Sequence, residues 1–145
     1  MSETRSQTYG TADASYLAAG GESGITRLVS DFYQLMEDHE GASCVRRLYP
    51  DDLSEPCRRL AAFLCGWLGG PRRYAENYGS INVPQFHMRW QVGDAEREAW
   101  LECMALAIAK QDYSAEFASY LLAQLRVPAL RITDAQQACR HKPDL

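Results

Sequence analysis

Apolar residues recur at helical spacing in several segments of the chain. The first segment follows the i, i+3, i+4, i+7 rule of an amphipathic helix, and Ser23-Gly24 stands just ahead of it as its start. A second segment has the same spacing and stops at Gly69-Gly70-Pro71, because glycine releases a helix and proline cannot continue it. The apolar positions of these two predicted helices are Ile25, Leu28, Val29, Phe32, Tyr33 and Met36, and then Leu60, Phe63, Leu64, Trp67 and Leu68.

Two further helices are predicted in the second half of the chain. Asp94 caps a third helix, and Ser114 begins a fourth. Their apolar positions are Trp100, Leu101, Met104, Ala105 and Ile108, and then Phe117, Tyr120, Leu121 and Leu125. No segment alternates as a half-buried strand would. Four principal helices in two pairs predict an all-α fold, a two-layer helical sandwich.

The two ends of the chain carry weaker patterns. We expect residues 1–22 to form an N-terminal extension that contains a short helical turn. Residues 23–127 are then the main helical domain. The helical pattern is lost after that point, so residues 128–145 are expected to be a C-terminal tail.

One segment combines weak periodicity with a candidate metal ligand. Residues 70–93 are rich in Gly, Pro, Asn and Tyr, and they contain His87 between Phe86 and Trp90. Connections longer than about 12 to 15 residues are usually functional or disordered. His87 stands 13 positions before Trp100, which opens an apolar helix. This arrangement favours a haem site in which an imidazole holds the iron and large apolar side chains form a wall, although a loop histidine and a core tryptophan are the simpler readings.

Composition narrows the classes of function. The 145 residues are 46% hydrophobic and 23% charged, as in an ordinary single globular domain. A net charge of -4 and a pI near 5.3 argue against nucleic acid or an anionic membrane surface as the main partner. There is no secretory signal and no run of about 18 apolar residues, so we expect a cytoplasmic protein. The 5 cysteines form no C-x-x-C pair and predict neither a disulfide framework nor a zinc site.

Several of these motifs together resemble one family. The chain is similar to the truncated haemoglobins with a two-over-two helical sandwich, and in particular to their group II. The resemblance covers roughly residues 10–125. The motifs that carry it, together with the spacing of His87 and Trp100, are Asp31-Phe32-Tyr33, Arg47-Leu48-Tyr49-Pro50, Phe63-Leu64-Cys65-Gly66-Trp67-Leu68-Gly69-Gly70-Pro71 and Ala95-Glu96-Arg97-Glu98-Ala99-Trp100-Leu101.

The resemblance implies a haem b cofactor and a role for individual residues. His87 would be the proximal iron ligand, and Trp100 the tryptophan on the ligand side of the haem that characterises group II. Tyr33 would be the distal tyrosine of the first long helix, and Tyr49 the aromatic residue where the chain turns toward the distal helix. The other residues expected to contact the cofactor are Leu60, Phe63, Leu64 and Trp90 along the haem, and Arg59 and Tyr74 at the propionate edge.

The chain departs from the family pattern on both sides of the expected haem. Phe86 stands where the family often has an arginine before the proximal histidine, and Arg89 is the nearest substitute. Pro56 occupies the distal position that carries histidine in ordinary globins. Because proline cannot donate a hydrogen bond, donors to a bound ligand must come from Tyr33, Tyr49 or Trp100.

The resemblance implies reversible binding of oxygen or another diatomic ligand, such as carbon monoxide or nitric oxide. A first alternative is a haem redox enzyme that reduces peroxide or converts nitric oxide to nitrate, which would require an external reductase. A second alternative is a helical interaction or sensor module that has lost the haem.

Overall fold

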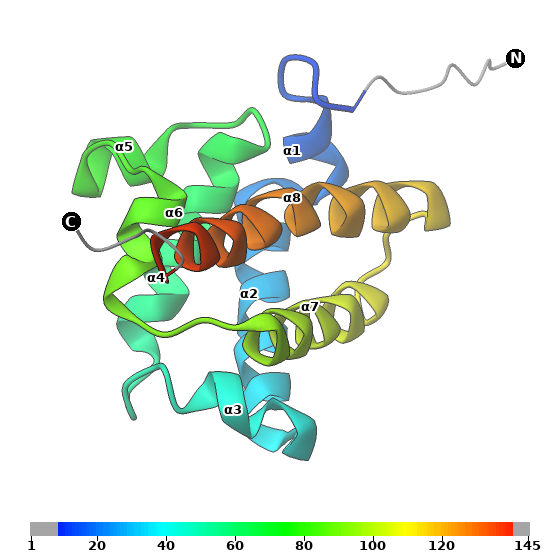
Figure 1. Cartoon of the computed structure of the whole chain (residues 1–145). Helices are drawn as coiled ribbons and strands as arrows, with labels where there is room; N and C mark the ends of the chain where they lie inside the picture. Colours follow the sequence, from blue (N-terminus) through cyan, green and yellow to red (C-terminus); the bar gives the residue numbers. More distant parts are fainter. Residues whose placement is uncertain (1–8, 141–145) are drawn as a thin grey trace, which may run out of the picture.

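The computed structural model describes residues 9–140, and this part of the chain contains helices and no strand (Figure 1). The all-α prediction is confirmed. The α-helices are α1 (Ala14–Ala18), α2 (Gly21–Asp38), α3 (Ser43–Arg46), α4 (Ser54–Trp67), α5 (Arg73–Tyr78), α6 (Val83–Phe86), α7 (Asp94–Ala109) and α8 (Ala115–Arg140). Two 3₁₀ turns join them, η1 (Glu40–Ala42) and η2 (His87–Arg89).

The long helices form the two crossed pairs that the sequence predicts. Helices α2 and α4 pack together as one layer, and α7 and α8 cross in front of them as the other (Figure 1). Helix α2 also packs directly on α7, so it joins the two layers. Its apolar face is fully buried, with Ile25, Leu28 and Phe32 each 0% exposed. The core therefore lies between the layers. The helical spacing of apolar residues in the sequence predicted the buried positions of α2.

The N-terminal helix α1 packs onto the end of α4 at a glycine. Gly69 has a left-handed φ of 96°, and a Cβ there would lie 2.0 Å from the carbonyl oxygen of Ala12. The carbonyl oxygen of Leu68 also accepts a hydrogen bond from the amide of Tyr16 at 3.0 Å. The glycine predicted to stop the helix thus also permits the close approach of α1.

The structure corrects two expectations about irregular segments. Residues 70–93 contain α5, α6 and η2, so they are a series of short helical elements. Helix α8 continues through Pro128 to Arg140, so residues 128–140, which the lost pattern assigned to a C-terminal tail, are helical. The buried positions beyond Pro128 include the polar residues Thr133 and Gln136. Tertiary packing stabilises the helix beyond Pro128, although its sequence lacks the stripe of apolar residues by which a helix is predicted.

None of the helices in residues 9–140 is both long and apolar enough to span a membrane. The polar start of the chain at residues 1–8 and the final residues 141–145, which include His141, lie outside the described residues.

The buried thiol of Cys103 on α7 gives a prediction about alkaline stability. Burial raises its pKa from 9.0 to about 11, and the nearby carboxylate of Glu102 acts in the same direction. The folded protein therefore favours the protonated thiol, and this contribution to stability is complete below pH 9 and is lost as the pH rises toward 11. We expect the loss to be on the order of 2 kcal/mol.

Urea unfolding at a series of pH values between 9 and 11 measures this effect. The Cys103→Ala variant, which has no thiol to ionise, should lose less stability over this range than the parent. Parallel pH profiles for the two proteins would contradict the prediction.

Candidate functional site

The candidate ligand His87 is held at the end of a short capped helix. The side chain of Asn82 accepts a hydrogen bond from the amide of Gln85 at 3.1 Å and so caps α6, which has a proline in its first turn. His87 follows on η2, and its Nδ1 lies 2.8 Å from the carbonyl oxygen of Val83. A carbonyl can only accept, so Nδ1 carries the hydrogen and Nε2 carries the lone pair. This is the tautomer that binds a metal through Nε2.

Aromatic rings surround this histidine, as the sequence predicts. The ring centroid of His87 lies 5.3 Å from that of Phe86 and 5.9 Å from that of Trp90. All three residues are partly buried. The structure thus brings the rings of Phe86 and Trp90 beside that of His87.

A second group of predicted residues meets on the other side of the core. Tyr33 lies on α2, Tyr49 follows α3, and Trp100 lies on α7. The rings of Tyr33 and Tyr49 are 5.5 Å apart, and the ring of Trp100 lies 4.9 Å from that of Phe32. Residues from three separate elements therefore form one cluster, here called the distal cluster, which comprises Tyr33, Tyr49 and Trp100.

Burial favours the protonated form of the two tyrosines in the distal cluster. Burial is the main cause that raises the pKa of Tyr33 well above 10.0, and its hydrogen bond to Tyr49 raises it further. Burial also raises the pKa of Tyr49, whereas hydrogen bonds from Trp100 and Tyr33 act in the lowering direction. An indole can only donate, so the Tyr49 oxygen is the acceptor that Trp100 and Tyr33 share.

The predicted propionate residues Arg59 and Tyr74 also lie together. The Nη1 of Arg59 on α4 donates to the hydroxyl of Tyr74 on α5 at 3.0 Å, and its Nε donates to Glu55 at 3.0 Å. The guanidinium carbon also lies 4.2 Å from the ring centroid of Tyr78. This position is set by a cation–π contact and two hydrogen bonds, so Arg59 is a positioned cation rather than a mobile surface side chain.

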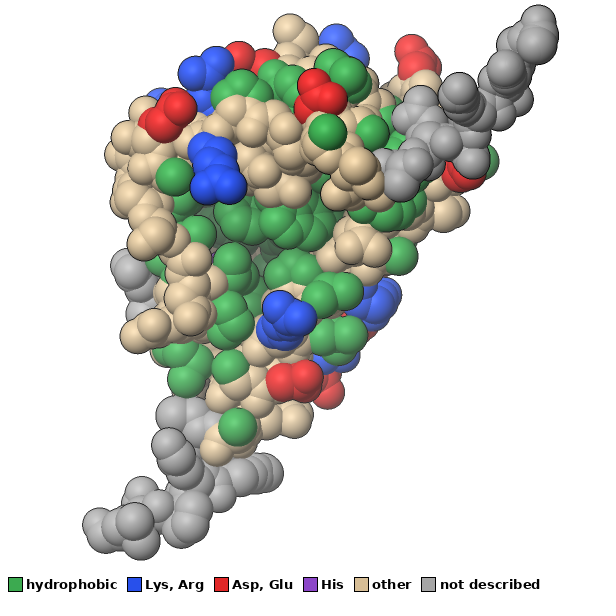
Figure 2. All heavy atoms as spheres, turned by 90° about the horizontal axis from the view of Figure 1, so that it is seen from above, with side chains coloured by type: hydrophobic (Ala, Val, Ile, Leu, Met, Phe, Trp, Pro, Cys, Tyr) green, Lys and Arg blue, Asp and Glu red, His purple; other side chains and the backbone are tan. Residues whose placement is uncertain are grey.

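A cavity of about 490 Å³ opens between α4, α6 and α8. Figure 2 shows a hollow on the face seen from above, with mostly hydrophobic side chains around it. Phe63 lines this cavity, whereas Leu64 is fully buried in the core and Leu60 packs against that core. The residues that line the cavity are Phe63, Trp67, Asn82, Val83, Pro84, Gln124, Val127, Pro128 and Arg131.

Comparison with known proteins identifies the family of this fold. The model of the bacterial-like globins matches residues 14–133. The chain belongs to the bacterial-like globin family. The match spans both helix layers and the segment that carries His87.

The similarity to individual relatives also covers most of this globin. It is 28% identical over 118 residues to the group 2 truncated hemoglobin YjbI of Bacillus subtilis (strain 168), a match that covers 81% of this chain and 87% of the relative. The group II 2-on-2 hemoglobin of Agrobacterium tumefaciens is 29% identical, with a TM-score of 0.79 over 91% of this chain and 97% of that one. The truncated oxygen-avid haemoglobin of Bacillus subtilis is 29% identical, with a TM-score of 0.75 over 81% and 97%. The resemblance to group II truncated haemoglobins is confirmed.

Sequence reasoning missed two polar side chains that hold this site. Gln136 contacts the segment after His87, and Arg46 contacts the turn that carries Tyr49. Gln136 lies 11 residues after Leu125, three helical turns along the same face, and that spacing was the available signal. Arg46 had no sequence signal, since paired arginines usually lie on a solvated helix face.

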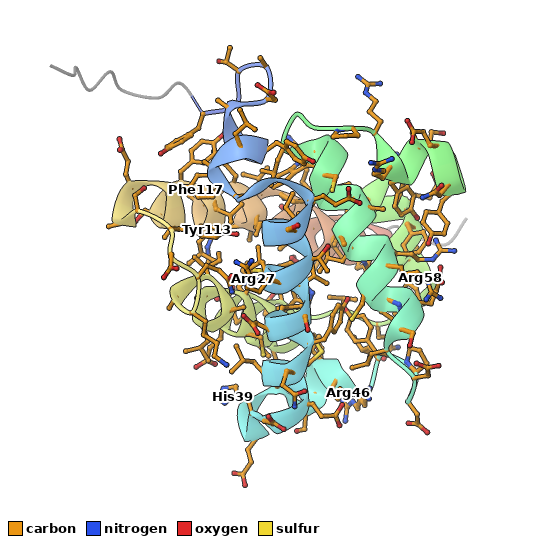
Figure 3. The ribbon with its side chains drawn as sticks, turned by 180° about the vertical axis from the view of Figure 1, so that it is seen from behind. Arg27, His39, Arg46, Arg58, Tyr113 and Phe117 are labelled. Carbon is orange, nitrogen blue, oxygen red and sulfur yellow. The ribbon has the colours of Figure 1, made fainter. Side chains whose placement is uncertain are left out.

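Arg46 joins the end of α2 to the turn after α3 (Figure 3). Its Nε donates to Glu37 at 3.0 Å. Its Nη1 donates to the carbonyl oxygens of Tyr49 at 3.4 Å and Pro50 at 3.1 Å, and its Nη2 donates to that of Asp51 at 3.3 Å. One planar guanidinium thus fixes the backbone that presents Tyr49 to the distal cluster.

We expect Arg46→Ala to lower the free energy of unfolding by about 1–2 kcal/mol, because several backbone carbonyls lose their charged donor. The matched control is Arg47→Ala. The side chain of Arg47 is 73% exposed and has an ion pair of 4.0 Å with Glu96, whereas that of Arg46 is 18% exposed. The control should change stability by less than about 0.5 kcal/mol in the same urea unfolding experiment. Equal losses of stability in the two variants would contradict the conclusion that Arg46 fixes the turn that carries Tyr49.

Proposed function

We propose that this globin holds haem b through His87 and reversibly binds oxygen or another diatomic ligand. Globins bind haem and small gaseous ligands as a family, and one similar structure is described as an oxygen-avid haemoglobin. The observation that carries the proposal is the 2.8 Å hydrogen bond between His87 Nδ1 and the carbonyl oxygen of Val83. It sets the tautomer and the ring direction that an axial ligand requires.

The chemistry of the surrounding residues fits this cofactor. A haem needs large apolar walls, and the cavity beside α6 provides them from Phe63, Trp67 and other apolar side chains. Leu60 and Leu64 lie on the same helix as Phe63, and Trp90 lies beside His87, so we include them in the proposed contact surface. The propionates are anionic, and Arg59 with Tyr74 offers them a positioned cation and a hydroxyl.

When bound, the haem supplies an iron with an open coordination position for the diatomic ligand. His87 would hold the iron through Nε2. The distal cluster would supply hydrogen-bond donors from buried Tyr33 and partly buried Tyr49 and Trp100, where water competes less than at the surface. Tyr33 and Trp100 both donate hydrogen bonds to the Tyr49 oxygen, which holds these two side chains in place. The hydroxyl hydrogen of Tyr49 itself would then be the donor to the bound ligand. Such donors slow the release of a ligand that gains negative charge.

The first test is the ultraviolet-visible spectrum of the protein reconstituted with haemin, recorded in ferric, ferrous and carbon-monoxide forms. We expect a stoichiometric Soret band that is lost or markedly altered in His87→Gly, because glycine has no side chain to bind the iron. The matched control is His39→Gly, since His39 lies at the end of α2 and pairs with Glu102 at 3.4 Å. A parent protein without a specific band, or His87→Gly with an unchanged band, would overturn the proposal.

The second test measures oxygen release by stopped flow. Tyr49→Phe should speed dissociation by about tenfold, the equivalent of one hydrogen bond, and by more than Tyr33→Phe, because Tyr49 is the acceptor that orders the cluster. The control is Tyr113→Phe. Tyr113 is partly buried, as Tyr49 is, but its hydroxyl donates to the carbonyl oxygen of Ala19 at 3.1 Å, at the α7–α8 end of the fold (Figure 3). If Tyr49→Phe and Tyr113→Phe release oxygen at the parent rate, the distal cluster has no part in ligand binding.

A further inference from the structure

The end of α8 places polar side chains in the interior of the fold. In residues 9–140, the buried polar side chains are those of Ser15, Thr133 and Gln136, and the last two lie within one turn of each other on α8. A buried polar group is costly unless hydrogen bonds satisfy it. Both residues of α8 make such bonds to the region between His87 and α7.

Gln136 bridges the two ends of the loop that follows the candidate iron ligand. Its Nε2 donates to the carbonyl oxygen of His87 at 3.1 Å. Its Oε1 accepts a hydrogen bond from the amide of Val92 at 3.0 Å. The residue is only 6% exposed, so both bonds are shielded from water. A primary amide suits this position because one planar group offers a donor and an acceptor.

Thr133 holds the other end of the same region. Arg97, near the start of α7, donates from Nη1 to the Thr133 hydroxyl at 2.9 Å. The hydroxyl in turn donates to the carbonyl oxygen of Leu130 at 3.1 Å. The last turns of α8 are therefore attached to the loop and to the first turn of α7.

His87 lies in a short turn that is followed by extended backbone. The 3₁₀ turn η2 ends at Arg89, and Trp90 is already extended, with φ of -120° and ψ of 158°. The carbonyl of His87 accepts from the amide of Trp90 at 3.1 Å within that single turn. Through the side chain of Gln136, this carbonyl is also hydrogen-bonded to the long helix α8.

We propose that Gln136 is a positioning residue for the axial histidine. The hydrogen bond to Val83 sets the direction of the imidazole ring, and Gln136 sets the position of the backbone from which the ring extends. Together they fix Nε2 relative to the cavity. This inference rests on the proposed role of His87 as the iron ligand and assigns to α8 the control of the proximal side.

Reconstituted holoprotein with Gln136→Glu and Gln136→Ala tests the inference. Gln136→Glu keeps the acceptor for Val92 and loses the donor to His87, whereas Gln136→Ala loses both. We expect haem transfer to an excess of acceptor apoglobin to become about tenfold faster in Gln136→Ala, as for other partners that orient metal ligands. Gln136→Glu should fall between this variant and the parent. The matched control is Gln137→Ala, because Gln137 is the next residue on α8 and is exposed.

A spectroscopic readout separates positioning from general support of the fold. The iron–histidine stretching band in the resonance Raman spectrum of the ferrous protein should shift in both Gln136 variants and stay unchanged in Gln137→Ala. A merely structural role would lower the melting temperature and leave this band in place. A folded Gln136→Glu protein with the parent band and the parent rate of haem transfer would overturn the inference.

The same spectra distinguish failure of this inference from failure of the proposed function. If the parent shows the band and His87→Gly loses it, the histidine is the ligand, and unchanged Gln136 variants then reject only the positioning role. If the parent has no such band, the proposed function itself fails.

Discussion

The burial of one face of α2 is the constraint on which the remaining structure depends. This helix packs against both α4 and α7, so its apolar stripe joins the two layers of the sandwich. Phe32 shows the connection directly, since it is fully buried and its ring lies 4.9 Å from that of Trp100. The next residue, Tyr33, extends from the same face into the distal cluster. The packing that holds the layers together thus also fixes the first polar group of the site.

Both sides of the site are held by hydrogen bonds from a planar side chain to the backbone of a short segment. On the distal side, the guanidinium of Arg46 binds backbone carbonyls of the turn that carries Tyr49. On the proximal side, the amide of Gln136 binds backbone groups at both ends of the loop after His87. Each short segment lacks the internal hydrogen bonds of a long helix. A planar side chain from a neighbouring element supplies the restraint, which accounts for precise geometry in segments with little regular structure.

The site combines apolar surroundings with a small number of directed polar groups. Burial raises the pKa values of Tyr33 and Tyr49, so the phenols remain protonated and serve as donors at neutral pH. The carbonyl of Val83 leaves the lone pair of His87 on Nε2. The two sides are therefore chemically different: one offers a metal-binding nitrogen and the other offers hydrogens. The proposed haem site would use both kinds of group.

The sequence by itself determined the all-α class and the principal helices, because helical periodicity is a local property of the chain. It also offered His87 as a candidate metal ligand, whereas the roles expected of Tyr33, Tyr49 and Trp100 came from the resemblance to the truncated haemoglobins. It did not reveal the length of α8, since its buried positions past Pro128 include polar residues whose partners lie more than 35 positions away. Only the tertiary structure decided which oxygen His87 Nδ1 binds, that Tyr49 is the shared acceptor, and that Gln136 spans the proximal loop. Hydrogen bonds between distant segments depend on where the folded chain places their donors and acceptors, so the periodicity of the sequence cannot predict them.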